Sequence, residues 1–178
     1  MSETRIGVIS DTHYTPHEYT SAYIQSLCKK LELAFAKTGL IIHCGDVTSQ
    51  EMLDMLSEIA PVEAVAGNTD AMGTCGHLPR IKLITVSDMN IGIIHGFGSP
   101  GGFPEKLQGS FDGFSSLKGG KLDVLAFGHT HTPFNKLING VLCFNPGSAV
   151  KPRAGFPASV GILTIASGRL INGEIINL

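Results

Sequence analysis

The sequence lacks several features that identify other classes of protein. Its four cysteines, Cys28, Cys44, Cys75 and Cys143, contain no Cys-x-x-Cys pair, so neither a structural zinc site nor a disulfide framework is indicated. We expect reduced, mostly buried thiols. Charged residues make up only 16% of the 178 residues, the net charge is −2, and Lys and Arg form no cluster. We therefore expect no extended nucleic-acid surface.

Long apolar runs and linkers are also missing. The N-terminal segment carries mixed charge and reaches Asp11 after an apolar run too short for a secretory signal, and no later stretch approaches the length of a membrane span. We expect a cytoplasmic protein that makes no membrane contact. Because repeats and low-complexity segments are absent, residues 1–178 are predicted to form a single domain. The Gly- and Ser-rich stretch 96–120 is expected to contain an irregular loop.

Short apolar runs, mostly β-branched, predict buried strands. These runs are residues 6–9, 40–42, 62–66, 91–94, 124–127, 141–144 and 160–165. Apolar residues at helical spacing predict a first helix between the first two strands, with Ile24, Leu27, Leu31 and Phe35 on one face. The capping box Thr48-Ser49-Gln50-Glu51 predicts a second helix. Strands that alternate with helices indicate a parallel core.

The second half of the sequence predicts hairpins instead of crossovers. Residues 81–86 and 91–94 flank a predicted turn at 87–90, and residues 162–165 are followed by Ser167-Gly168 and a further strand from Leu170. The expected fold class is therefore α/β, with mixed sheets flanked by helices.

Side chains that can bind metal follow five of the predicted strands. They are Asp11 and His13, Asp46, Asn68, His95, and His129 with His131. Sites in open α/β sheets gather beyond the carboxyl ends of strands, so we expect these side chains to converge. Glycines stand beside most of them, as in Gly45-Asp46 and Gly128-His129, and allow unusual backbone angles or close approach. Oxygen and imidazole ligands without a thiolate suit Mn, Fe, Zn or Ni.

Taken together, these blocks resemble the calcineurin-like metallophosphoesterase superfamily, in particular its small bacterial and archaeal phosphodiesterase branch. The matching blocks are Asp11-Thr12-His13, Gly45-Asp46, Gly67-Asn68, His95-Gly96 and Gly128-His129-Thr130-His131. The resemblance extends from Ile6 to about Ser148 and implies two mixed β-sheets packed as a sandwich flanked by helices. It also implies a homodimer or tetramer. Asn145-Pro146-Gly147-Ser148 resembles the same branch, although a turn that closes a strand is the favoured interpretation.

The resemblance implies a binuclear metal site. One ion would be held by Asp11, His13, Asp46 and His131, and the other by Asp46, Asn68, His95 and His129, with Asp46 as the bridge. Two divalent ions are expected, with Mn favoured and Fe, Zn or Ni as alternatives. With two ions, two carboxylates and a bridging hydroxide, the site would keep a charge of about +1 and attract a phosphodiester.

The implied activity is that of a phosphodiesterase acting on small-molecule phosphate esters through a metal-bridging hydroxide. Asp46, Asn68 and His95 are the candidate catalytic residues. A phosphomonoesterase with the same ligands, and a noncatalytic protein-binding scaffold similar to a retromer subunit, are the alternatives.

One position departs from the pattern of larger family members, which place His after the motif Asn. Here that residue is Thr69, a poor general acid, so we expect a preference for esters with good leaving groups. Thr69, His17 and Arg153 are candidate substrate contacts, and Lys151 is a further candidate phosphate contact. Asp70 is either a partner of a ligand histidine or a solvated turn residue.

Overall fold

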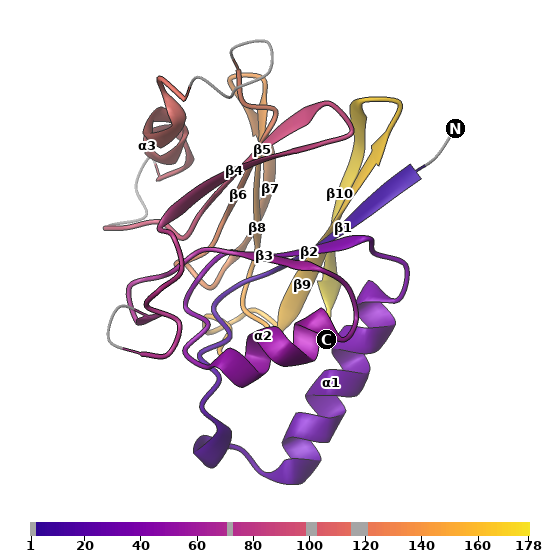
Figure 1. Cartoon of the computed structure of the whole chain (residues 1–178), viewed down its shortest axis with the longest axis vertical. Helices are drawn as coiled ribbons and strands as arrows, with labels where there is room; N and C mark the ends of the chain where they lie inside the picture. The colour runs from indigo at the N-terminus through magenta and orange to yellow at the C-terminus, as the bar shows by residue number, and fades with distance from the viewer. Residues whose placement is uncertain (1–2, 71–72, 99–102, 115–120) are drawn as a thin grey trace.

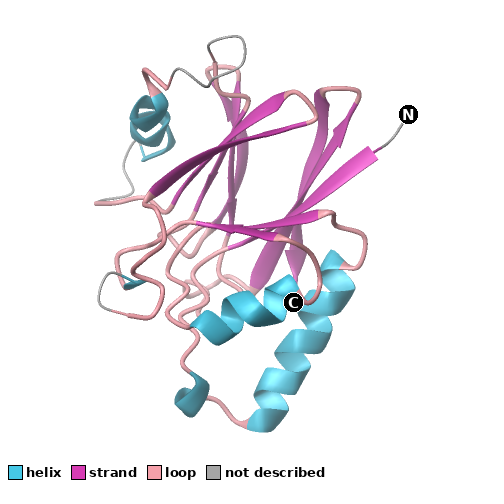
Figure 2. Ribbon diagram, in the orientation of Figure 1, coloured by secondary structure: helices cyan, strands magenta, loops and turns pink. Residues whose placement is uncertain are grey.

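The strands of the protein form two five-stranded sheets that pack face to face (Figures 1 and 2). The computed structural model describes residues 3–70, 73–98, 103–114 and 121–178. In the first sheet the order is β10 (Arg169–Asn177), β9 (Ser159–Ala166), β1 (Glu3–Ile9), β2 (Leu40–His43) and β3 (Val62–Ala64). β1, β2 and β3 are parallel, and β9 pairs antiparallel with both β1 and β10. The carboxyl ends of β1, β2 and β3 therefore share one edge.

The second sheet has a parallel centre with antiparallel edges. Its order is β4 (Ile81–Val86), β5 (Met89–Ile94), β6 (Val124–Phe127), β8 (Val141–Pro146) and β7 (Pro133–Ile138). β5, β6 and β8 run parallel, whereas β4 and β7 pair antiparallel with their neighbours. The predicted fold class, α/β with two mixed sheets flanked by helices, is confirmed.

Apolar side chains of both sheets fill the space between them. The cluster includes Ile6, Val8, Ile42, Leu163, Ile91, Ile93, Ala126 and Phe144, all buried. Because successive side chains of a strand point to opposite faces, the remaining apolar residues face outward and need a second cover. Helices supply it, which explains the continuous apolar runs in the sequence.

Two helices cover the outer face of the first sheet, and a third covers the second sheet (Figure 2). α1 (Ser21–Phe35) and α2 (Gln50–Ser57) bury apolar side chains, among them Leu31, Phe35 and Leu56, in one cluster with Ile41 of β2. α3 (Phe103–Gln108) packs Phe103 and Leu107 against β6. These contacts anchor the loops that leave the carboxyl ends of the strands.

Several local predictions need correction. The N-cap of α2 is Ser49 rather than Thr48, and its side chain accepts a hydrogen bond from Glu51 N, so the predicted capping box is not the one that forms. The turn between β4 and β5 has two residues, Ser87 and Asp88, because Met89 and Asn90 already pair with β4. β3 ends at Ala64 rather than at residue 66. β7 was not predicted.

The predicted loop 96–120 is partly helical. It contains α3 and the short 3-10 helix η3 (Gly109–Phe111), while residues 99–102 and 115–120 lie outside the described part of the chain. These two helices were not predicted. That residues 1–178 form a single domain stays a prediction.

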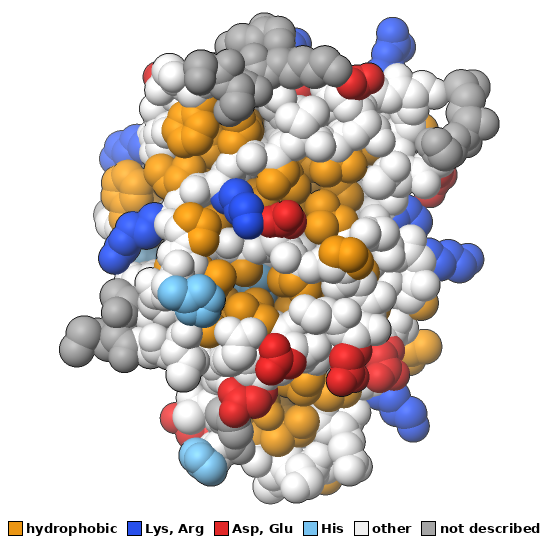
Figure 3. Space-filling model, in the orientation of Figure 1, with side chains coloured by type: hydrophobic (Ala, Val, Ile, Leu, Met, Phe, Trp, Pro, Cys, Tyr) orange, Lys and Arg blue, Asp and Glu red, His pale blue; other side chains and the backbone are white. Residues whose placement is uncertain are grey.

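Two further features are the distribution of charge on the surface and the apolar character of the helices. On the face shown in Figure 3, Lys and Arg side chains are scattered rather than gathered. Among the described helices, none combines the length and the apolar character that crossing a membrane requires.

Candidate metal centre

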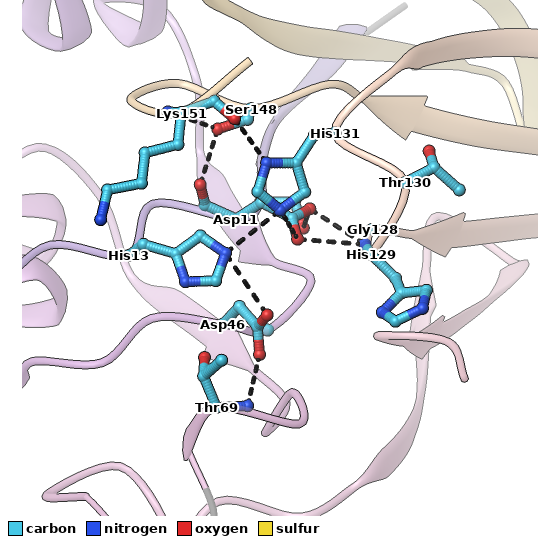
Figure 4. Close-up of polar contacts among 12 residues, drawn as sticks. Asp11, His13, Asp46, Thr69, Gly128, His129, Thr130, His131, Ser148 and Lys151 are labelled. Carbon is cyan, nitrogen blue, oxygen red and sulfur yellow. Dashed lines mark hydrogen bonds and ion pairs between the residues drawn. The ribbon is translucent and has the colours of Figure 1, made fainter. Parts of the chain in front are cut away.

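The predicted metal ligands converge at the edge where parallel strands of both sheets end. Asp11 and His13 follow β1, Asp46 follows β2, Asn68 follows β3, His95 follows β5, and His129 and His131 follow β6. Figure 4 shows Asp11, His13, Asp46 and His131 pointing toward one another. The sandwich thus brings together side chains as distant in sequence as Asp11 and His131.

The backbone at this edge adopts angles that are uncommon outside glycine. Five of the seven candidate ligands have left-handed φ values: Asp11 (51°), His13 (40°), Asp46 (53°), His129 (69°) and His131 (55°). Each such residue costs free energy, and such residues cluster where a site dictates side-chain direction. The strain is evidence that this edge is a functional site.

Glycines let the ligand loops approach closely, as expected from the sequence. A Cβ on Gly67 would lie 2.1 Å from Asp46 Oδ1, and one on Gly128 would lie 1.9 Å from Ser10 Oγ and 2.7 Å from Asp11 Oδ2. Only a residue without a side chain fits at these two positions.

The first group of ligand atoms has the spacing of a shared cation. His13 Nε2 lies 3.1 Å from His131 Nε2 and 3.4 Å from Asp46 Oδ2. His131 Nε2 lies 3.2 Å from Asp11 Oδ1. Two ligands about 2.1 Å from one ion, at angles of about 90–110°, lie roughly 3.0–3.4 Å apart. The donor atoms of Asp11, His13 and His131 therefore lie close enough together to share a metal ion.

A second group adjoins the first. His95 Nε2 lies 3.3 Å from Asp46 Oδ2 and 3.2 Å from Asn68 Oδ1, and His129 Nδ1 lies 3.1 Å from the same Asn68 oxygen. Asp11 also approaches this group, but its Oδ1 is 3.9 Å from His95 Nε2. Asp46 Oδ2 thus approaches a histidine of each group, and Asp11 belongs to both candidate ligand clusters.

Backbone carbonyl groups fix the protonation of three ligand histidines. His95 Nδ1 bonds to Cys44 O at 2.8 Å, His129 Nε2 to Gly98 O at 3.2 Å, and His131 Nδ1 to Lys151 O. Because a carbonyl oxygen only accepts, these nitrogens carry the hydrogen, and the other nitrogen of each neutral ring offers a lone pair. The lone pairs of His95 and His131 then face carboxylate oxygens. That arrangement is repulsive unless a cation lies between them.

Contacts with the two carboxylates shift the pKa values of several candidate ligands. Burial lowers the pKa of His95, but its contacts with Asp46 and Asp11 outweigh burial, so the net shift is upward. The hydrogen bond with Asp11 raises the pKa of His131. Burial acts to raise the pKa of Asp46, yet bonds with His95 and Thr69 lower it well below its usual range. For His13 burial prevails and lowers the pKa.

Asp70 is a buried clamp between the loop of Asp46 and the loop of Asn68. Its Oδ2 accepts hydrogen bonds from Gly67 N at 2.7 Å and Val47 N at 3.2 Å, and its Oδ1 accepts from Thr48 N at 2.8 Å. Asp70 is 0% exposed. Neither sequence interpretation was right, because Asp70 is no solvated turn residue and its hydrogen bonds go to backbone N–H groups rather than to a ligand histidine.

Three further buried polar residues support the ligand loops. His43 accepts from Gly45 N and contacts Thr12 Oγ1 at 3.1 Å, and burial lowers its pKa to about 4, so it is neutral near neutral pH. Asn145 Nδ2 donates to Gly128 O, and Ser148 Oγ donates to Asp11 O. The turn interpretation of residues 145–148 missed this supporting role.

The candidate substrate contacts are placed differently from one another. Thr69 is exposed beside the site, and its N–H donates to Asp46 Oδ1 at 2.9 Å. Arg153 N donates to His131 O at 3.1 Å, which holds this residue next to a candidate ligand. His17 is exposed in the 3-10 helix η1 (Pro16–Glu18), and within the described residues no hydrogen bond or ion pair joins it to the ligands. Lys151 Nζ instead pairs with Glu18 at 3.4 Å.

Comparison with known proteins places this arrangement among metal-dependent phosphoesterases. Residues 4–168 match the calcineurin-like phosphoesterase superfamily domain. A probable metallophosphoesterase of Methanocaldococcus jannaschii is 43% identical over 151 residues, covering 83% of this chain and 69% of that protein. One from Methanothermobacter thermautotrophicus is 37% identical over 171 residues, covering 96% and 91%. A phosphodiesterase of Methanocaldococcus jannaschii is 26% identical over 173 residues, covering 89% and 92%.

Solved structures show the same fold. An archaeal phosphodiesterase superposes with a TM-score of 0.72 at 24% identity, covering 98% of this chain and 100% of the other. A Vps29 mutant from Entamoeba histolytica gives a TM-score of 0.67 at 23% identity, covering 98% and 99%. At these identities the likeness shows the fold alone.

Proposed function

Because the chain belongs to the calcineurin-like phosphoesterase superfamily, we propose that it is a phosphodiesterase whose seven ligand side chains hold two divalent metal ions. The observation that carries this proposal is the convergence of lone pairs and carboxylate oxygens at 3.1–3.4 Å, with the opposite nitrogens of three rings fixed on carbonyl groups. Such a cluster favours bound cations, because carboxylates and lone pairs face one another at these distances.

The chain's own residues would divide the work as follows. Asp11, His13 and His131 would hold one ion, Asn68, His95 and His129 would hold the other, and Asp46 would contribute to both. When bound, divalent ions polarise phosphoryl oxygens and activate water for attack on phosphorus. Asp46, Asn68 and His95 fix the position of the phosphoryl group, and the hydrogen bond from Thr69 N keeps Asp46 in place. The exposed Arg153 adds positive charge beside the site.

We propose diesters rather than monoesters as substrates, and Mn as the favoured metal with Fe, Zn or Ni as alternatives. One relative named as a phosphodiesterase supports the first choice. The oxygen and imidazole donor set supports all four metals. A cytoplasmic location and a homodimer or tetramer remain predictions.

The test combines metal analysis with steady-state kinetics. Protein stripped with chelator and reloaded with each metal should bind two ions per chain and hydrolyse bis(p-nitrophenyl) phosphate faster than p-nitrophenyl phosphate. Asp46→Asn should lower kcat by at least about 100-fold, since outer partners of metal ligands alone contribute 10–100-fold. Asp54→Asn, an exposed change in α2, is the matched control and should leave kcat unchanged.

Two results would contradict the proposal. An unchanged kcat in Asp46→Asn would show that hydrolysis does not require the Asp46 carboxylate. If two ions bind but no ester is hydrolysed, the noncatalytic scaffold is favoured. Vps29 has the same fold as this chain. Metal binding alone does not decide, because a Vps29 structure also contains Zn²⁺.

A further inference from the structure

A pocket of about 540 Å³ opens directly beside the candidate metal centre. Its size falls within the range of small-molecule sites, about 300–1,000 Å³. His129 belongs to both places, because it lines the pocket while its Nδ1 lies 3.1 Å from Asn68 Oδ1. Gly98, whose carbonyl contacts His129 Nε2, also lines the pocket. A ligand whose phosphoryl group sits at the metal centre can therefore extend into this pocket.

The pocket has a continuous aromatic wall. The ring of Phe103 stacks on His129 at 5.7 Å and 19°, and it packs against Phe127 at 5.8 Å. Phe127 in turn contacts Phe134 at 6.0 Å. Phe103 and Phe127 are buried, whereas Phe134 is only half-buried and presents its ring to the pocket. Such a wall favours a flat apolar partner over a hydrated one.

Cations border the same wall. Arg153 lines the pocket, and among the described residues no carboxylate pairs with its guanidinium. Lys136 Nζ lies 5.6 Å from the centre of the Phe134 ring. Guanidinium groups stack on aromatic faces. An aliphatic chain would pack against the apolar wall but would not stack with the guanidinium of Arg153, whereas an aromatic ring would do both.

We propose that this pocket binds a planar aromatic or heteroaromatic ring carried by the phosphate ester. The inference rests on the proposed function for the phosphoryl end and adds the chemical class of the organic group. Phe134 is the principal ring contact, and Arg153 stacks on the ligand ring at the pocket wall.

Binding of non-hydrolysable phosphonates tests the pocket without requiring turnover. Phenyl-, cyclohexyl- and methylphosphonate offer the same phosphonate oxygens to the Mn²⁺-loaded protein and differ only in the group that would enter the pocket. Calorimetry should give a phenylphosphonate Kd about tenfold below that of methylphosphonate, as expected for one well-packed ring. Cyclohexylphosphonate should fall between them.

Substitutions in the pocket wall test which residues cause the preference for phenylphosphonate. Phe134→Ala should abolish most of the phenyl preference and leave the methylphosphonate Kd unchanged. Arg153→Ala should bring the ratio of the phenyl and cyclohexyl affinities toward one. Leu137→Ala, which removes a 71%-exposed apolar side chain from the same strand, is the matched control and should change neither ratio.

Three outcomes would overturn the inference: equal affinity for phenyl- and methylphosphonate, cyclohexylphosphonate binding as tightly as phenylphosphonate, or an intact phenyl preference in folded Phe134→Ala. Each can occur while bis(p-nitrophenyl) phosphate is still hydrolysed, in which case only the pocket assignment fails. Absence of hydrolysis with two ions bound would instead reject the proposed function, and the phosphonate ratios would still report on the pocket.

Discussion

At the scale of single residues, Asp70 does more for the site than its position suggests. Among the described residues its carboxylate has no hydrogen bond to a candidate ligand side chain, yet it receives three backbone N–H groups from the two loops that carry Asp46 and Asn68. A buried N–H group that loses its acceptor costs about 1–3 kcal/mol. Asp70 therefore stabilises both the fold and the geometry of the metal centre.

We predict that Asp70→Asn destabilises the protein by about 1–3 kcal/mol and weakens Mn²⁺ binding about 10–100-fold. The new amide NH₂ would face one backbone N–H group, so one donor would lack an acceptor. Denaturant unfolding with chelator measures the first effect, and calorimetry with Mn²⁺ the second. Asp54→Asn should stay within about 0.5 kcal/mol of the wild type. Equal stability of the two variants would show that Asp70 is not a clamp.

Thr69 determines a second prediction. Its N–H is engaged with Asp46, and its hydroxyl is a poor proton donor for a departing alkoxide. Within a series of p-substituted phenyl and alkyl diesters, we expect kcat to fall steeply as the pKa of the leaving group rises. Thr69→His should flatten this dependence by supplying a general acid. Equal rates for alkyl and aryl diesters, with chemistry rate-limiting, would contradict the expectation.

The sequence could predict the ligands better than their supports. Polar side chains directly after strands carry a positional signal, and the seven candidates all lie where parallel strands of the two sheets end. The carbonyl groups of Cys44 and Lys151 orient ligand histidines through the backbone, which leaves no trace in residue type. Asn145 and Ser148 had a weak signal in residues 145–148, but only tertiary contacts show that they reach the site.

At the scale of elements, β7 shows where strand prediction fails and which signal was available. As an edge strand it exposes Asn135, Lys136 and Leu137, so no continuous apolar run marks it. The turn that follows it does carry a signal, because Asn139-Gly140 favours a two-residue hairpin with both φ values positive. The observed values are 52° and 78°.

This turn yields a prediction with a closely matched control. A Cβ on Gly140 or on Gly39 would meet no atom within 4 Å, but only Gly140 has a positive φ, of 78°. Gly140→Ala should therefore destabilise the protein by about 1–2 kcal/mol through backbone strain. Gly39→Ala should stabilise it by about 0.4–1 kcal/mol by restricting the unfolded chain. Chemical unfolding measures the change in the free energy of unfolding for both variants. If the two changes have the same sign, the positive φ of Gly140 is not the cause.

At the scale of the whole molecule, the candidate metal centre joins the two sheets. Asp11, His13, Asp46 and Asn68 follow strands of the first sheet, whereas His95, His129 and His131 follow strands of the second. Without metal, this shared edge holds two buried carboxylates and several strained backbone positions. Metal ions bound there would link the two sheets at the point where the two buried carboxylates lie close together.

Metal removal should therefore affect both sheets at once. With free Mn²⁺ about 100-fold above Kd, binding at one site adds about 2.7 kcal/mol, which for a domain of this size raises Tm by roughly 5–10 °C. Chelator should reverse the rise, and Asp46→Asn should reduce it by more than half because Asp46 serves both ions. Hydrogen exchange should slow in β1 and β2 as well as in β5 and β6 when Mn²⁺ is added. A cation held by ligands from both sheets stabilises both sheets against local unfolding. Protection confined to one sheet would therefore mean that the ligands of the other sheet do not bind metal.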